Sequence, residues 1–120
     1  MMQGTFRDEH PRIVLSLPGM QDRLDVEFIV DTGFAGDLSL PIRLINQTEV
    51  TLMGFRDRRL ATGQEFRCPY CSIMLEWDGE VRLTEVLVLE GDPLLGTVLL
   101  REYLILVEMT DGGEISIEPL

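Results

Sequence analysis

Cysteine and long apolar runs are both scarce in this sequence. Two cysteines among 120 residues are too few for a disulfide framework, which favours a reducing, cytoplasmic location. The first apolar run, residues 13–17, is too short for a signal-peptide core or a membrane span. We therefore expect a cytoplasmic protein with no membrane partner.

Positive charge is also in short supply. The chain has 10 basic and 21 acidic residues, a formal net charge of −11 and a pI near 4.3. Nucleic acids and anionic membranes would repel such a surface at neutral pH, so no nucleic-acid partner is expected. The acidic excess itself is typical of a solvated exterior and indicates no particular activity.

The length and composition are those of one globular unit. A chain of 120 residues can bury one core but not two large lobes, and 45% of its residues are hydrophobic. We find no internal repeat, low-complexity tract or linker. The sequence predicts a single domain over residues 1–120.

Alternating apolar and polar residues predict strands in the first half of the chain. Residues 13–17 and 24–30 alternate in this way, and the Leu17-Pro18-Gly19 turn that follows the first of them predicts a hairpin. A short strand over 38–41 should stop at its proline, and residues 42–47 should form one helical turn. Hairpins therefore dominate this half.

The second half of the chain continues the pattern. Residues 61–64, Ala-Thr-Gly-Gln, predict a hairpin tip that is followed by an extended segment to Trp77. Asp78-Gly79 is the strongest two-residue hairpin signal, and a strand over 81–89 should follow it. Met53 and Met74 are expected in the core.

One helix is predicted near the C-terminus. Leu99, Leu100, Tyr103 and Leu104 are spaced to share one helical face. Strands should follow over residues 104–109 and 115–117, with a turn at 111–113. The expected fold class is all-β with one short C-terminal helix.

The stretch FIVDTGFAG, Phe28–Gly36, places Asp31-Thr32-Gly33 at the end of an alternating strand. There the backbone leaves the sheet, Gly33 can adopt dihedral angles closed to other residues, and a carboxylate gains a rigid support. Asp-x-Gly at a strand end is also commonly a simple turn, and the triplet alone favours that interpretation. A second signature, Leu94-Leu95-Gly96, favours a functional site instead.

Together these stretches resemble the retroviral-type (retropepsin-like, clan AA) aspartic proteases, and most closely their small cellular and bacterial DTGF-type relatives. The matching stretches follow the family's order from about residue 26 to the C-terminus: VDTGFAGDLSLP, LATG, EWDGE, LLGTVLLREYLILVEM and DGGEISIEPL. The resemblance implies a retropepsin-like acid-protease barrel whose active site is completed by homodimerisation.

The resemblance implies a role for each matching residue of the active-site loop. Asp31 matches the catalytic aspartate. Thr32 matches the residue whose hydroxyl ties two such loops together, and Gly33 the glycine that lets them approach. Leu95 and Gly96 match the hydrophobic-glycine pair that braces the loop from behind.

Substrate-binding roles follow in the same way for the flap and the pocket. Ala61, Thr62 and Gly63 match the flap tip, and Phe34 and Leu94 are expected to line the pocket. Two positions depart from the retroviral pattern. Phe34 replaces a small residue after DTG, and Thr97 stands where retroviral enzymes carry an arginine, so pocket preference and dimer strength should differ.

Aspartic proteolysis needs two carboxylates that share one proton. The chain contains one DTG and no DSG, so the simplest complete site is a twofold homodimer with Asp31 of each copy on the axis. Hydrolysis of a polypeptide substrate in this way needs no metal and no cofactor. Because each copy carries a net charge of −11, mildly acidic buffer should favour both dimerisation and activity.

The CPYC motif, Cys68-Pro69-Tyr70-Cys71, has the spelling of a glutaredoxin dithiol. Such a dithiol has its first cysteine at a helix start, whereas an extended segment is predicted here. Two cysteines and His10 are too few for a four-ligand structural zinc site, although two cysteines from each of two subunits would suffice. The pattern favours small half-buried residues with a bulge or edge at Pro69.

Two other functions stay open beside an aspartic endopeptidase. A catalytically weak or inactive retropepsin-like module would bind peptides or assemble through the same fold. A dithiol oxidoreductase would depend on Cys68 rather than on Asp31. The intact Asp31 favours the endopeptidase, because a pure binding module has no need of an ionisable group at that position.

Overall fold

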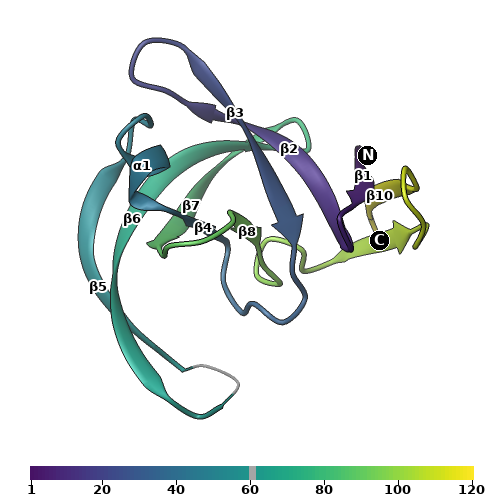
Figure 1. The fold of residues 1–120 in the computed structure, drawn as a ribbon. Coiled ribbons are helices and arrows are strands. Elements are labelled where there is room, and N and C mark those ends of the chain that lie inside the picture. The colour runs from purple at the N-terminus through teal and green to yellow at the C-terminus, as the bar shows by residue number, and fades with distance from the viewer. Residues whose placement is uncertain (60–61) are drawn as a thin grey trace.

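The computed structural model describes residues 1–59 and 62–120, and these form a mostly β structure (Figure 1). One short helix, α1, covers Ile42–Ile45. The strands are β1 Met2–Arg7, β2 His10–Pro18, β3 Arg23–Val30, β4 Leu38–Leu40, β5 Thr51–Arg59, β6 Glu65–Trp77, β7 Glu80–Val88, β8 Leu94–Leu95, β9 Tyr103–Val107 and β10 Glu114–Pro119. The predicted all-β class is confirmed.

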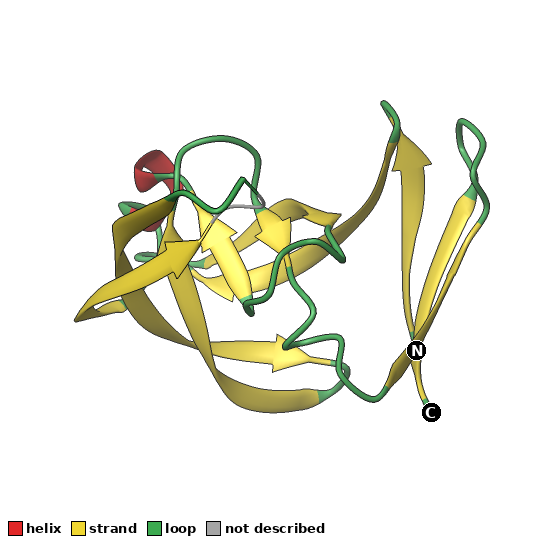
Figure 2. Cartoon of the chain, turned by 90° about the horizontal axis from the view of Figure 1, so that it is seen from below, coloured by secondary structure: helices red, strands yellow, loops and turns green. Residues whose placement is uncertain are grey.

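All ten strands belong to one sheet in the order β5-β6-β7-β4-β8-β3-β2-β1-β10-β9. The sheet is strongly curved, and the β5–β6 hairpin projects from the body of the molecule (Figures 1 and 2). Strands β1 and β10 and both chain ends lie on the opposite side. The β3–β4 loop lies between the hairpin and the chain ends in Figure 1, and this arrangement positions the site described below.

Two predicted hairpins are confirmed. Strands β2 and β3 pair antiparallel from Arg12↔Ile29 to Pro18↔Arg23. Strands β6 and β7 pair from Tyr70↔Leu87 to Trp77↔Glu80 across the turn at Asp78 and Gly79. Those two residues have φ of 51° and 84°, as a two-residue turn between twisted strands requires.

The core lies inside the curved sheet. It receives the inward side chains of the alternating strands, among them Leu17, Phe28, Leu75 and Ile115, each with 0% exposure. Trp77 is also buried, and its ring meets that of Tyr103 edge-on at 5.6 Å. Burial alternates with a period of two along much of β2, β6 and β10, and for β2 this explains why alternation located the strand in the sequence.

The predicted C-terminal helix is wrong. Residues 97–102 form turns, with one hydrogen bond of α-helical spacing, from the N–H of Leu100 to the carbonyl of Gly96 at 3.4 Å. Glu102 then takes a left-handed φ of 67°, and Tyr103 begins β9 by pairing with Pro119. Pairing with β10 therefore takes the residues that a second helical turn would need. The single turn expected over 42–47 is present as α1.

Three strands and the burial of two side chains differ from the prediction. Strands β1 and β5 carry little alternation in their sequences, β8 has only two residues, and none of the three was predicted. Met53 and Met74 are 54% and 55% exposed rather than buried. Met74 lies opposite Leu83, itself exposed, on the outer face of the β6–β7 pair, so the alternation there places apolar residues outward.

Candidate active site

Asp31 lies where β3 leaves the sheet. Its N–H donates to the carbonyl of Leu95 in β8 at 2.9 Å, and its Oδ1 accepts the N–H of Gly33 at 2.8 Å. These bonds fix the backbone and one carboxylate oxygen. Its Oδ2 has no hydrogen bond within the described part of the chain, and the side chain is partly exposed, so the carboxylate is both positioned and accessible.

The sheet topology explains why residues 31–37 form a loop over β8. Strand β8 lies between β3, to which it is parallel at Val30↔Leu95, and β4, to which it is antiparallel at Leu38↔Leu95. The connection from β3 to β4 must therefore cross the end of β8. The two signatures seen in the sequence are brought into direct contact at this crossing.

Hydrogen bonds hold the loop against the segment that follows β8. Three backbone amides of that segment donate to loop carbonyls: Gly96 to Asp37 at 2.9 Å, Thr97 to Phe34 at 2.9 Å and Val98 to Gly36 at 3.1 Å. The Thr97 hydroxyl also donates to the Phe34 carbonyl at 3.3 Å. Such support holds a reactive side chain in place without a helix or a metal.

Asp31 borders a pocket of about 270 Å³ under the β5–β6 hairpin. Its lining comes from the loop, from the C-terminal end of β7, from β8 and from the hairpin: Asp31, Gly33, Phe34, Ala35, Arg58, Arg59, Phe66, Leu87, Leu89 and Leu94. Most of these side chains are apolar, and the charged ones are the aspartate and two arginines. A mostly apolar pocket with a few charged groups at its border is typical of a small-ligand or side-chain binding site.

The structure brings some of the predicted site residues together and separates others. Phe34 and Leu94 line the pocket beside Asp31. Thr62 and Gly63 lie at the tip of the hairpin and do not line the pocket, and Ala61 falls outside the described residues. Thr32 is exposed on the loop.

Sequence reasoning missed the pocket residues that belong to the arms of the hairpin. Arg58 lies opposite Phe66 in the β5–β6 register, and both line the pocket, as does Arg59. The missed β5 strand explains the omission. Had β5 been recognised, its residues would have been paired with β6 across the tip, and Arg58 would have been placed on the same face as Phe66.

Asp37 ties the end of the loop to β7. Its Oδ2 accepts the N–H of Glu85 at 3.0 Å. Burial raises the pKa of Asp37 above its ordinary value of 3.8, and the nearby carboxylate of Glu85 adds to the shift, whereas the hydrogen bond from the Glu85 N–H opposes it. The loop therefore contains a carboxyl group whose ionisation costs folding free energy.

The stability of the Asp37→Asn variant, compared with that of wild type, should increase as pH rises. A raised pKa means that the contribution of Asp37 is fully present below its ordinary pKa and is lost as pH rises through the folded-state value. The free-energy difference between Asp37→Asn and wild type should therefore grow from about pH 3.5 to pH 7. Urea unfolding at a fixed protein concentration measures it.

The stability contribution of Glu27 changes with pH in the opposite direction, but it cancels in the difference between Asp37→Asn and wild type. A hydrogen bond from Arg7 lowers the pKa of Glu27, so its contribution is present above its ordinary value and is lost as pH falls. Both proteins share this group. A stability difference that stays constant across the pH range would contradict the role assigned to Asp37.

The CPYC cysteines are buried strand residues. Cys68 and Cys71 are 4% and 2% exposed within β6, so they are more buried than the half-buried positions predicted. Three positions apart on a strand, their side chains leave opposite faces. Burial raises the pKa of both thiols, which disfavours the reactive thiolate. A register shift in β5 between Leu52 and Gly54 lies beside this segment.

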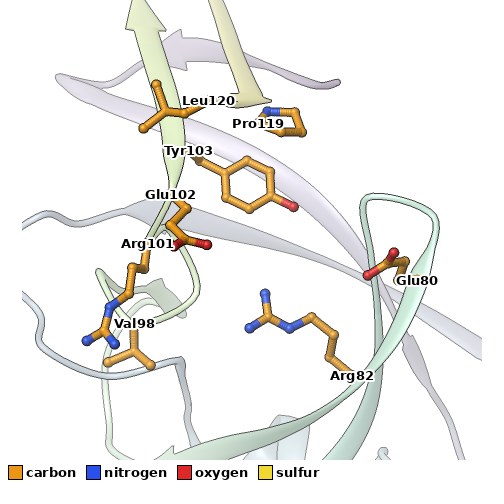
Figure 3. Close-up of a pocket in the computed structure, with 8 residues that line it drawn as sticks. All are labelled: Glu80, Arg82, Val98, Arg101, Glu102, Tyr103, Pro119 and Leu120. Atoms are coloured by element: carbon orange, nitrogen blue, oxygen red, sulfur yellow. The ribbon is translucent and has the colours of Figure 1, made fainter.

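A larger hollow lies elsewhere in the molecule. It has a volume of about 860 Å³, and Figure 3 shows Glu80 and Arg82 of β7 on one side of it and Arg101, Glu102 and Tyr103 on the other. Carboxylates and guanidiniums alternate around it, so it offers no field of one sign to a ligand. Neither the Asp31-Thr32-Gly33 triplet nor Leu94-Leu95-Gly96 lines it. We therefore place the candidate site at the smaller pocket of Asp31.

No group of three or more His, Cys, Asp or Glu side chains in residues 1–59 and 62–120 is arranged to hold a metal ion. In the same residues, no helix is long and apolar enough to cross a membrane. Comparison with protein-family models, curated proteins and solved structures finds no match for the chain. The functional argument therefore rests on the geometry of the site.

Proposed function

We propose that this chain is one subunit of a homodimeric, retropepsin-like aspartic endopeptidase with Asp31 as its catalytic residue. One observation carries the proposal: at a strand end the Asp31 backbone N–H donates to Leu95 of β8, the Asp31 carboxylate accepts the N–H of Gly33, and this side chain borders a mostly apolar pocket beneath a projecting hairpin. A strand-end turn with a purely structural role would need no such pocket.

The chemistry requires a second carboxylate. Each chain has one Asp31, so the twofold partner would supply the second carboxylate. The two carboxyl groups brought together would share a single proton. Thr32 and Gly33 support this arrangement, since both are exposed on the loop and free to meet their counterparts.

The proposed reaction is hydrolysis of a peptide bond by water. The ionised Asp31 takes a proton from the water as its oxygen attacks the scissile carbonyl carbon, while the protonated Asp31 donates to the carbonyl oxygen. Collapse of the resulting diol breaks the C–N bond, and a carboxyl proton passes to the leaving amine. Each round consumes one water, and the proton returns to the pair.

The hairpin and the loop would have distinct tasks in that reaction. The β5–β6 hairpin would cover the bound peptide and exclude bulk water, which strengthens the interactions of the carboxylates inside. The hydrogen bonds to Leu95 and Gly33 would keep the carboxylate oriented towards the scissile bond. Phe34, Phe66 and Leu94 would receive an apolar side chain of the substrate.

Thr32→Val should weaken the dimer. Valine has nearly the same shape but lacks the hydroxyl, so two hydrogen bonds at the axis would be lost, which corresponds to a dissociation constant raised roughly ten- to a hundredfold. Sedimentation velocity over a concentration series measures this. Thr51→Val, at an exposed threonine that begins β5, is the matched control. Equal dissociation constants for the two variants would count against Thr32 at the axis.

The test of the proposed function is cleavage of a diverse peptide library, read by mass spectrometry from mildly acidic to neutral pH. Cleavage that is blocked by a hydroxyl-bearing transition-state mimic would support an aspartic endopeptidase. Intact peptides with a protein shown to be dimeric would overturn the proposal and favour a module that only binds peptides. Cleavage that persists in the presence of the mimic would also overturn it.

A further inference from the structure

Positive charge is concentrated in the projecting hairpin. Between residues 56 and 67 the sequence has four of its ten arginines and two acidic residues, in a chain whose net charge is −11. These arginines are Arg56, Arg58, Arg59 and Arg67. Two of them, Arg58 and Arg59, line the pocket of Asp31. A locally basic element on an acidic protein creates a favourable field for negative charge at that place.

Arg58 is held in position but has unused hydrogen-bonding capacity. Its Nη2 donates to Glu85 Oε1 at 2.8 Å and its Nη1 to the carbonyl of Asp57 at 3.1 Å. Its Nε is buried and has no hydrogen-bond partner in the described residues. A buried N–H without an acceptor is unfavourable, so the Arg58 guanidinium is not fully satisfied by its protein partners.

Glu85 is shared, which fixes Arg58 without neutralising the cluster. The same carboxylate also receives Arg56 Nε at 3.2 Å, and the Arg56 guanidinium lies 4.0 Å from the centre of the Tyr70 ring. Two guanidiniums thus compete for one carboxylate. The cluster keeps a surplus of positive charge beside the pocket.

Arg59 is the more exposed of the two pocket arginines. It pairs with Glu65 across the hairpin at 2.9 Å, and the two side chains are 70% and 71% exposed. Such an exposed pair contributes little to stability because water and salt screen it. A substrate carboxylate in the pocket can therefore replace Glu65 as the partner of Arg59 at small cost.

We propose that the cleft selects polypeptide segments with an acidic side chain next to an apolar one, and that Arg58 and Arg59 bind the carboxylate. The apolar neighbour would enter between Phe34, Phe66 and Leu94. This proposal rests on the proposed endopeptidase activity for its cleavage test, whereas the recognition itself requires only binding. An acidic partner also matches the basic surface that borders the pocket.

The first test compares two peptide pools that differ only in whether one side chain is a carboxylate or an amide. Both pools have apolar residues at the centre, and a glutamate fixed at one flanking position in the first pool is a glutamine in the second. Wild type should cleave the glutamate pool with a kcat/KM about tenfold higher or more, because each charge-assisted bond to a guanidinium is stronger than its neutral equivalent. The difference should appear mainly in KM.

Three variants assign the preference to particular residues. Arg58→Gln and Arg59→Gln should each reduce the glutamate preference several-fold, and Arg58→Lys should restore part of it. Arg67→Gln is the matched control, since Arg67 lies on the same hairpin and pairs with Asp57 at 3.0 Å but does not line the pocket. A preference lost equally in Arg67→Gln would overturn the assignment to Arg58 and Arg59.

A binding measurement separates this proposal from the proteolytic one. Both pools are passed over immobilised Asp31→Asn protein, and the retained peptides are identified by mass spectrometry. Enrichment of glutamate peptides that Arg58→Gln and Arg59→Gln abolish would support acidic recognition even without any cleavage. Cleavage or retention that is equal for the two pools would overturn it and leave the endopeptidase standing, and absence of both cleavage and enrichment would overturn both.

Discussion

Asp31→Asn should abolish peptide-bond hydrolysis. In a homodimer one substitution changes both copies of the carboxylate, so the site loses both its base and its acid. General acid–base groups typically contribute 10²–10⁴-fold each, so a fall in kcat of at least about a thousandfold is expected. A fluorogenic peptide chosen from the library experiment measures the residual rate.

The same variant should retain its fold and its dimer. The asparagine side chain offers an amide oxygen in the place of Asp31 Oδ1, so the hydrogen bond from the Gly33 N–H can persist. Asp25→Asn, an exposed position earlier on β3, is a control with the same change of charge. Wild-type turnover by Asp31→Asn would refute the mechanism, whereas loss of turnover in both variants would point to a charge effect.

Gly96→Ala should both destabilise the protein and inactivate it. A Cβ at Gly96 would meet the carbonyl oxygens of Gly36 and Phe34, the latter at 2.6 Å, and the Phe34 ring at 2.8 Å. The two oxygens belong to the loop that positions Asp31, and they cannot move without breaking its bonds to Thr97 and Val98. We expect a loss of about 2–4 kcal/mol in stability, at or above the upper end for overpacking.

The cause of that loss can be separated from the ordinary effect of replacing glycine. Gly91→Ala, at a glycine with φ of 110° and no described atom within 4 Å of the added Cβ, tests backbone strain alone. Adding Phe34→Ala to Gly96→Ala should give no rescue, because the carbonyl oxygens remain. Urea unfolding and the fluorogenic assay measure both effects, and a stable, active Gly96→Ala would refute the close contact.

Local chemistry made several elements predictable from the sequence. The alternation over residues 24–30 located β3, and Asp78-Gly79 located the β6–β7 turn, because both signals depend on neighbouring residues only. Pro41 marked the end of β4 in the same way. The helical turn that follows has one buried residue, Ile45. A signal that depends only on neighbouring residues can be recognised in a single sequence.

Tertiary pairing decided the elements that were missed. Leu99 and Leu100 have helical spacing and are buried, but pairing of Tyr103 with Pro119 converts the next residues into β9. Strand β1 owes its conformation to pairing with β10 at one side and β2 at the other. Because β10 lies at the far end of the chain, no pattern of neighbouring residues identifies β1 as a strand.

The residues of the candidate site fall into the same two groups, those marked by a local motif and those placed by tertiary pairing. The sequence singled out Asp31, Phe34 and Leu94 through the two signatures that the fold brings together. Arg58 and Arg59 could not be found, because their place in the pocket depends on the β5–β6 register and on the curvature of the sheet. The resemblance to retropepsins carried the functional prediction, which stays a prediction until the cleavage test is made.

The crossing of the loop over β8 also dictates when the site can exist during folding. Strand β8 pairs with β3 and β4, and the bond from Thr97 to Phe34 closes a separation of 63 residues. Contacts between such distant segments form late, after the local hairpins. The Asp31 carboxylate would therefore be oriented only after residues 94–98 have docked against the loop, so a half-folded copy would lack the arrangement of the candidate site.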